Sequence, residues 1–499
     1  MKAFRSITLQ IKGFTGEKRI SVESTLVLLT FTNSGINDGD RNIGVVDKSY
    51  AVALSQGEMD MDRETARAGR FVGSLLTMAI LFVLSASPTL AQVKPGDFIT
   101  PDNASKVKDL VTPGQYLRVL HGMSIKVVPT ERIDWPPPYK DATEKYSGQV
   151  RLTPSRRSLI GYVAGEPFPT VDANDHDAGT KVMWNVAFRP ISSDEYDLRW
   201  FDCDSVYWGK GATFREITDI EVGHYAGYNE VGRTEVEPMP VDPDFKSTGR
   251  YFLGLLYPVL APQDSRGVGL IKFRYADPKK EDDSWTWTPG ARRVRRLNYA
   301  ILDSATGAQA YDPNHYEGFS GKNENYDWRL IGEKSMLGAI NIEHVPDVRC
   351  PTDGGASHCP DNWQMRHEFV VEGKPRPGAF ESLYSHEILY IDSEADFVMA
   401  NDQYDRQGQL FVNYTSWMRY SDRSEPDAKI AIYPFKREFQ SGSSSINVQS
   451  GFSTVCYHPS PQAPSRDSWF INMGSVDRDW FTPEAMARAA EGGHALSGD

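Results

Sequence analysis

The sequence lacks the short motifs that mark most enzyme and cofactor sites. It contains no HExxH, no GxSxG and no paired Cys-His signature, so neither metal-assisted nor nucleophilic catalysis has a local sequence basis. No glycine-rich turn joins a strand to a helix in the pattern that holds a nucleotide. The acidic run at 172–177 lacks the glycine and the closing glutamate of a calcium loop and is expected to cap a loop. We therefore expect no catalytic residues, no metal site and no cofactor.

The chain also lacks a hydrophobic run long enough to span a membrane near its start. The uncharged apolar stretch at 71–84 has about 14 residues, short of the roughly 20 that a permanent transmembrane helix needs. Arginines precede it and small residues follow it, which is the layout of a secretory signal peptide. With no cysteine at the processing point and no twin arginine, general secretion is indicated. We predict a signal peptide over 59–91, cleavage between Ala91 and Gln92, and a periplasmic location.

Residues 1–58 do not fit a signal-bearing protein, because a signal peptide begins within a few residues of the initiator. A start at Met59 or Met61 gives a charged segment of ordinary length. All eleven tryptophans and all four cysteines lie after Gln92, which fits material outside any packed domain. We predict that 1–58 is a mis-assigned, disordered upstream extension. A genuine N-terminal extension is the alternative.

Basic residues are fewer than acidic ones. Without residues 1–91, the chain holds about 44 Lys and Arg against about 58 Asp and Glu. An acidic surface repels phosphates, and neutralisation of phosphates by Lys and Arg provides most of nucleic-acid binding. Nucleic acid is therefore excluded as a partner.

Four cysteines are few, and they are even in number in a chain that carries an export signal. Disulfides are the expected state in that compartment, and three pairings are possible. Cys350 and Cys359 flank a turn-rich loop whose closure costs little entropy. This favours the Cys350–Cys359 bridge, with Cys203–Cys456 as the remainder. A zinc site is the weaker alternative, since the cysteine spacing does not supply paired ligands.

Extended segments separated by Gly, Pro, Asn and Asp are abundant in the chain after residue 92. Short runs rich in β-branched and aromatic residues predict strands. They lie at 124–128, 149–152, 159–164, 181–188 (which contains Trp184), 196–201, 267–275, 284–288, 292–302 and 365–372.

Three more segments within 383–420 form the clearest hairpin series, joined by loops of the length that antiparallel neighbours use. A short helix is expected after Asp102 and Asn103, and a last one where Thr482 and Pro483 supply an N-cap and a first-turn proline. The pattern predicts a mainly β fold: one large antiparallel domain over 92–480, a large curved sheet or half-open barrel with a few covering helices. A C-terminal helix and frayed tail follow over 481–499.

Several segments resemble a proteobacterial periplasmic family known as domain of unknown function 1329, whose fold is similar to that of the Lol-type lipoprotein carriers. The matching segments follow the family's order from about residue 100 to about 465. They are PPPYKDATEKYSGQVRL (136–152), GYVAGEPFPTVDANDHDAGTKVMWN (161–185), DSWTWTPGARRVRRL (283–297), GFSGKNENYDWRLIGEKSMLG (318–338) and YSHEILYIDSEADFVMANDQYDRQGQL (384–410). The four cysteines and the long linker near 340–363 depart from the family.

The resemblance implies a half-open barrel whose concave face holds an acyl chain or another hydrophobic small molecule. It also implies partners: an RND-type inner-membrane exporter and an outer-membrane protein. We therefore expect a non-enzymatic periplasmic carrier of lipid or other apolar cargo. A periplasmic adaptor that docks a transporter and carries nothing is the first alternative.

Trp285 and Trp287 share one face of a predicted strand, and Arg292 and Arg296 share a face of the next. With Trp184 they are candidate ligand-binding residues, the tryptophans for a chain and the arginines for an anionic head group. The alternative is a tryptophan pair packed in the core, with arginines that are solvated or paired with acidic residues.

A secreted hydrolase is the second alternative. Carboxylates such as Glu368 and Glu387 could form a glycosidase pair, but their spacing does not distinguish them from strand surface charges. Such an enzyme would also need polar groups with shifted pKa values that converge in the cavity.

Overall fold

Strands make up most of the regular structure, as the sequence pattern predicts. The computed structural model describes residues 93–192, 194–208, 214–297, 314–343, 361–379, 382–460, 463 and 465–492. The predicted signal peptide, the upstream extension, and Cys350 and Cys359 with their loop lie outside the described residues.

Sixteen strands join in one sheet, and β3 and β4 form a separate pair. In chain order the strands are β1 (Phe98–Ile99), β2 (Ile125–Val127), β3 (Arg151–Leu152), β4 (Leu159–Ile160), β5 (Glu195–Trp208), β6 (Phe214–Asn229), β7 (Arg250–Ala261), β8 (Gly269–Tyr275), β9 (Asp283–Thr288), β10 (Arg293–Leu297), β11 (Tyr326–Ile340), β12 (Asp361–Pro375), β13 (His386–Asp392), β14 (Phe397–Tyr404), β15 (Leu410–Ser421), β16 (Arg437–Asn447), β17 (Phe452–Tyr457) and β18 (Trp469–Ile471).

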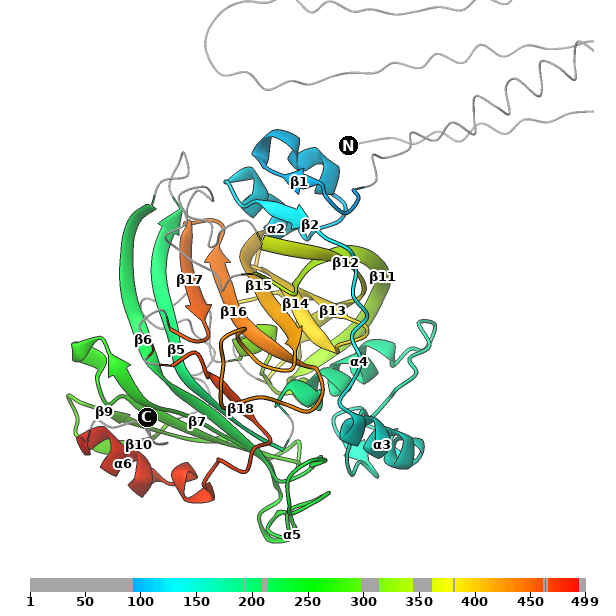
Figure 1. Cartoon of the computed structure of the whole chain (residues 1–499). Coiled ribbons are helices and arrows are strands. Elements are labelled where there is room, and N and C mark those ends of the chain that lie inside the picture. Colours follow the sequence, from blue (N-terminus) through cyan, green and yellow to red (C-terminus); the bar gives the residue numbers. More distant parts are fainter. Residues whose placement is uncertain are drawn as a thin grey trace, which may run out of the picture. The chain divides into compact units, whose positions relative to one another are not determined.

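The sheet is closed in one half and open in the other. Its strand order is β1-β2-β12-β13-β14-β15-β16-β17-β5-β6-β7-β8-β9-β10. β11 pairs with β12 along most of its length, and its last two residues pair in parallel with β15. Strands β11 to β15 therefore form a closed strand ring, whereas β5 to β10 continue as a curved open sheet (Figure 1). The predicted fold class, a large curved and mostly antiparallel sheet or half-open barrel, is confirmed.

Few helices accompany this sheet. The α-helices are α2 (Pro113–Leu120), α3 (Pro137–Tyr146), α4 (Ala178–Ala187), α5 (Phe245–Thr248) and α6 (Pro483–Gly492). The 3-10 helices are η1 (Pro101–Val107), η2 (Ser147–Gln149), η3 (Pro190–Ser192), η4 (Gln263–Ser265), η6 (Tyr316–Gly318), η7 (Asn323–Asn325) and η8 (Arg478–Phe481). The two helices expected from the sequence are present as η1 and α6, and the Thr482 hydroxyl caps α6 by accepting from the Ala485 N–H at 3.1 Å.

The segment 181–188, predicted as a strand, is helical instead. It lies in α4, whose residues are nearly all buried, including Val182, Met183 and Val186. A helix buried on all sides shows no amphipathic stripe, so its short apolar run is indistinguishable from that of a buried strand. The acidic run before α4 caps a loop as expected, with the Asp177 N–H donating to the Asp175 carboxylate at 2.8 Å.

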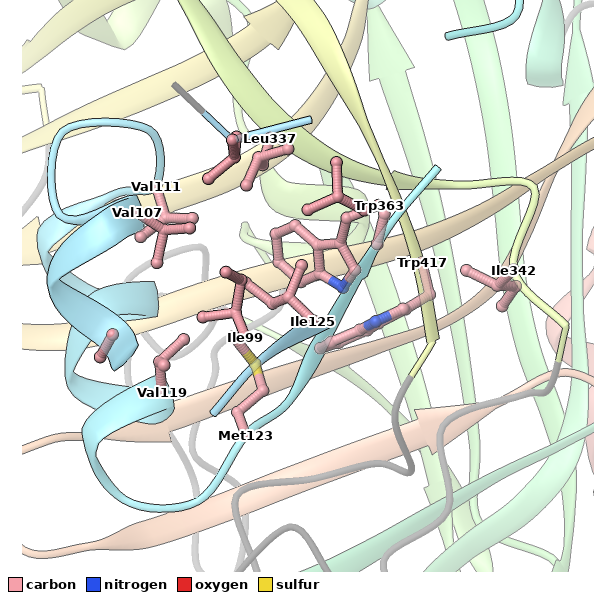
Figure 2. Packing of buried hydrophobic residues seen from close by; sticks show 14 residues of the cluster. Ile99, Val107, Val111, Val119, Met123, Ile125, Leu337, Ile342, Trp363 and Trp417 are labelled. Atoms are coloured by element: carbon pink, nitrogen blue, oxygen red, sulfur yellow. The ribbon is translucent and has the colours of Figure 1, made fainter. Parts of the chain in front are cut away.

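A hydrophobic cluster fastens the N-terminal part to the strand ring. Figure 2 shows Ile99, Val119 and Ile125 packed around Trp363 of β12 and Trp417 of β15. All five side chains are fully buried. Because buried indole rings contribute the largest apolar areas in a core, this cluster fixes β1, β2 and α2 at one end of the ring.

A buried arginine holds α2 against the sheet. Arg118 is fully buried, and its guanidinium donates to the Asn413 side chain at 2.6 Å, the Ser444 hydroxyl at 2.8 Å, and both backbone carbonyls at 2.9 Å. Asp402 lies beside this network and accepts from the Gly114 N–H at 3.1 Å. Burial raises the pKa of Asp402 to about 6. The N-terminal helix is therefore joined to β14, β15 and β16 by polar contacts away from water.

Candidate functional site

Two adjoining cavities lie between the open half of the sheet, α4 and the segment 314–325. The apolar chamber is lined by Leu198, Phe201, Tyr225, Leu256, Trp469 and the Cys203–Cys456 disulfide. The charged chamber is lined by Arg189, Tyr225, Tyr251, Lys272, Arg274 and Glu317, among others. Tyr225 and Glu317 belong to both linings, so the chambers are neighbours.

The chambers together suit one small molecule. Their volumes are about 50 Å³ and about 100 Å³. Together they give about 150 Å³, which is below the roughly 300–1,000 Å³ of most small-molecule pockets. A cavity of about this size can hold one small apolar molecule.

Side chains from distant strands make the apolar chamber water-excluding. Leu198 on β5 and Leu256 on β7 face it beside the disulfide, which joins directly paired residues of β5 and β17. His458 also lines it, and burial lowers the pKa of this imidazole to about 4. The ring is therefore neutral at ordinary pH. Among the described residues that line the chamber, Glu317 at its boundary is the one that carries a charge.

Ion pairs neutralise most of the charge in the charged chamber. Arg189, at the end of α4, pairs with Glu317. Arg274 on β8 pairs with Asp282 through Nε and Nη2, at 3.0 and 2.9 Å, and donates to the Gly321 carbonyl at 2.9 Å. Among the residues that the structure describes, no ion pair or hydrogen bond engages the Lys272 ammonium. The chamber therefore presents one uncompensated positive charge.

The backbone of the open sheet brings this lysine to the chambers. Tyr196, Gly227, Gly254 and Lys272 are directly paired across β5, β6, β7 and β8, so they lie in a row on one face. The Tyr196 ring covers Gly227, where an added Cβ would lie 2.3 Å from that ring. With glycine at two of the four positions, no side chain from the row separates Tyr196 from Lys272.

A buried histidine anchors the segment that closes the chambers. His315 lies 3.0 Å from Glu387 on β13, and Asn401 on β14 donates to the same carboxylate at 2.7 Å. Two residues further on, Glu317 pairs with Arg189, which lies just after α4. The strand ring thus holds the segment in place over the open half of the sheet, and α4 covers its other side.

Replacing Lys272 by methionine is expected to stabilise the protein by roughly 1–3 kcal/mol at about pH 6. Burial, followed by the neighbouring Arg274 charge, lowers the pKa of Lys272 to about 7. The unfolded chain keeps an ordinary lysine pKa, so it holds the proton more tightly than the fold does. The cost is therefore full below pH 7 and fades as the pH rises from the folded pKa toward the unfolded one.

Denaturant unfolding at about pH 6 and about pH 10 measures this effect. The gain of the methionine variant should be largest at the lower pH. Lys279→Met, in the exposed loop after β8, is the matched control and should change little. Equal stability of wild type and Lys272→Met at both pH values would contradict a buried, uncompensated charge.

Comparison with known proteins assigns the chain to a family. Residues 98–487 match the family described as protein of unknown function, DUF1329. The chain belongs to this DUF1329 family. An uncharacterized protein of Pseudomonas aeruginosa is 24% identical over 365 residues, which cover 67% of this chain and 72% of that protein.

Two solved structures also match part of the chain. A DUF1329 family protein from Desulfovibrio piger matches with a TM-score of 0.41 and 15% identity, over 62% of this chain and 98% of that one. A LolA superfamily protein from Nitrosomonas europaea matches with a TM-score of 0.33 and 9% identity, over 62% of this chain and 98% of that one.

In this DUF1329 protein, the candidate tryptophans of β9 lie on the face of the sheet opposite the chambers. Trp285 is paired with Ile271, whereas Lys272 is the next residue of β8 and faces the other way. Trp287 is buried in a cluster with Met486 of α6. A ligand role for this pair stays a prediction, and it would require a site separate from the chambers.

The candidate arginines do not share a strand face as expected. Arg292 precedes β10 and has a φ of 45°, in the turn after Pro289 and Gly290. Arg296 lies in β10, directly opposite Trp285, and forms an ion pair with Asp283. The turn takes up one more residue than the sequence pattern suggested, so the strand begins at Arg293.

Trp184 is separated from the other four candidates. It lies on α4 and stacks on Phe188, with ring centroids 6.0 Å apart and planes at 15°. Phe188 itself lines the charged chamber. Of the five predicted ligand residues, Trp184 is the one that packs directly behind a chamber wall.

The structure does not bring Glu368 and Glu387 together. Glu368 is opposite Asp392 and Glu387 is opposite Gly373, five positions further along β12. That offset is roughly 17 Å along the strand, well beyond the separation in a glycosidase pair. Glu387 instead holds His315, and burial raises the pKa of Glu368 well above its usual value.

The expected Cys203–Cys456 disulfide is present. Cys350 and Cys359, for which the sequence favours a second bridge, lie outside the described residues. The helices that the structure describes include none that is both long and apolar enough to cross a bilayer.

Proposed function

We propose that this DUF1329 protein is a periplasmic binding protein that carries a lipid or another hydrophobic molecule in the two chambers. The observation that carries the proposal is the apolar chamber, where Leu198, Phe201, Leu256 and Trp469 surround space that no side chain fills. Unfilled apolar space costs packing energy, because its lining lacks contact partners. A bound chain would restore those contacts.

Exchange of the cargo with membrane proteins is part of the proposal. The family resemblance suggests an RND-type inner-membrane exporter and an outer-membrane protein as donor and acceptor. The half-open sheet supports such a role, since a carrier must both shelter a chain and release it. The strand ring gives a fixed frame, and the cover made of α4 and the segment 314–325 is held by side-chain contacts that an acceptor could displace.

Filling the apolar chamber tests the proposal. Leu256→Trp adds an indole where Leu256 faces the chamber, and the added volume should weaken binding of an apolar chain roughly tenfold or more. Native mass spectrometry of protein from the periplasmic fraction identifies co-purifying molecules, and displacement of a fluorescent fatty-acid probe measures affinity.

Ile160→Trp is the matched control, because Ile160 is exposed on the separate β3–β4 pair. It should bind the probe like wild type. Thermal unfolding of both variants checks that the fold is retained. Wild-type protein that carries no apolar molecule and shows no saturable probe binding would overturn the proposed function.

A further inference from the structure

Lys272 differs from the other charged side chains of the charged chamber. Arg189 and Arg274 each have a carboxylate partner within the fold. Lys272 has none among the described residues, although its side chain is half-buried and lines the chamber. An ammonium partly removed from water without a counter-ion is costly, and groups of this kind cluster at functional sites.

The position of this charge relative to the apolar chamber is the second observation. Tyr225 and Glu317 border both chambers, so the ammonium and the apolar lining face adjoining parts of one space. Gly227 and Gly254 lie between Tyr196 and Lys272 in the strand pairing, and the rings of Tyr196 and Phe252, which also line the charged chamber, cover them. A chain that enters the apolar chamber can therefore keep its polar end beside Lys272.

Neighbouring charges define the sign of that polar end. Lys272 is accompanied by four charged residues: Arg274 on its own strand, Asp282 before β9, Arg189 just after α4 and Glu317 on the covering segment. The last four are paired with one another in two ion pairs. One negative charge on the ligand would compensate the chamber, whereas a positive charge would add to the uncompensated one.

We propose that the cargo is a single-chain amphiphile with one anionic head group, of the medium-chain carboxylate class, whose head binds the Lys272 ammonium while its chain occupies the apolar chamber. This inference rests on the proposed function. The size of the chambers argues against two acyl chains, because their combined volume of about 150 Å³ leaves no room for a second one.

The burial that lowers the pKa of Lys272 supports this assignment. A carboxylate in contact with the ammonium favours its charged form. Binding should therefore draw a proton onto Lys272 near neutral pH, and titration calorimetry in buffers of different ionisation enthalpy would detect that uptake.

The experiment compares three probes that differ only in their head group: dodecanoate, dodecanol and dodecyltrimethylammonium. Each is titrated below its aggregation concentration into wild type, Lys272→Met, Lys272→Arg and the surface control Lys279→Met, at about pH 6 where Lys272 is charged. Wild type and the control should bind dodecanoate roughly tenfold or more tightly than dodecanol. Lys272→Met should lose the preference for dodecanoate and keep its affinity for dodecanol. Lys272→Arg should retain most of the preference for dodecanoate.

The outcomes separate the inference from the function on which it rests. Equal affinity of wild type for dodecanoate and dodecanol, or an unchanged preference in Lys272→Met, overturns the head-group assignment and leaves the apolar carrier standing. Tightest binding of dodecyltrimethylammonium also overturns it. Failure of all three probes to bind wild type counts against the proposed function itself.

Discussion

Removing the Cys203–Cys456 disulfide is expected to lower the free energy of unfolding by about 5 kcal/mol. The two cysteines are 253 positions apart in the sequence, so the bridge closes a very long loop and restricts the unfolded chain strongly. It also joins β17 to β5, the contact through which the strand-ring half of the sheet path continues into the open half. The double variant Cys203→Ala/Cys456→Ala removes the bridge without adding a polar group.

Equilibrium unfolding in guanidinium under oxidising conditions measures the loss. The matched comparison is Cys350→Ala/Cys359→Ala, where the predicted bridge closes a short loop and a smaller effect is expected. Binding of an apolar probe should weaken in the first double variant, because the disulfide forms part of the apolar chamber's wall. An unchanged midpoint for Cys203→Ala/Cys456→Ala would contradict the stabilising role.

Replacing Arg118 by leucine is expected to cost roughly 3–5 kcal/mol of stability. The substitution removes the four hydrogen bonds that Arg118 donates to Asn413 and Ser444, and it leaves these buried acceptors without their donor. It also withdraws the positive charge that favours the ionised form of Asp402. Helix α2 should then detach from β15 and β16 before the sheet unfolds.

Hydrogen exchange of the α2 amides, together with denaturant unfolding, checks this expectation. Arg157→Leu in the exposed β3–β4 loop is the control and should change stability by less than about 0.5 kcal/mol. Wild-type protection of α2 in Arg118→Leu would show that the hydrophobic cluster alone holds the helix.

The individual strands and the last helix could be predicted because each carries a recognisable pattern in its own segment of the sequence. The hairpin series β13 to β15, the Trp-rich β9 and the capped α6 each carry their own pattern of alternation, turn residues or capping residues. The prediction of a strand at 181–188 was wrong because this segment is a helix buried among other elements. Such a helix has no polar face, so its sequence does not show the helical periodicity. Closure of the strand ring by β11 and β15 had no local signal, because it depends on a contact between strands far apart in sequence.

The chambers could not be predicted for a related reason. Leu198, Leu256, Lys272 and Glu317 come from different elements and meet only in the folded sheet. Lys272 and Arg274 alternate with apolar residues in β8, a pattern that ordinarily indicates a face exposed to water. Trp285 and Trp287 were predicted to bind a ligand because they are tryptophans that share a strand face, yet they pack beneath α6.

The exposed arginines of β10 lie at the edge of the sheet. β10 ends the order of the open half of the sheet, so one of its edges has no neighbour among the strands that the structure describes. An unpaired strand edge can pair with a strand of another chain and so lead to aggregation. Charged side chains at the edge disfavour such pairing. Arg293 and Arg295 are exposed there. Their positive charges disfavour pairing of this edge with the same edge of a second copy, because like charges would then face each other.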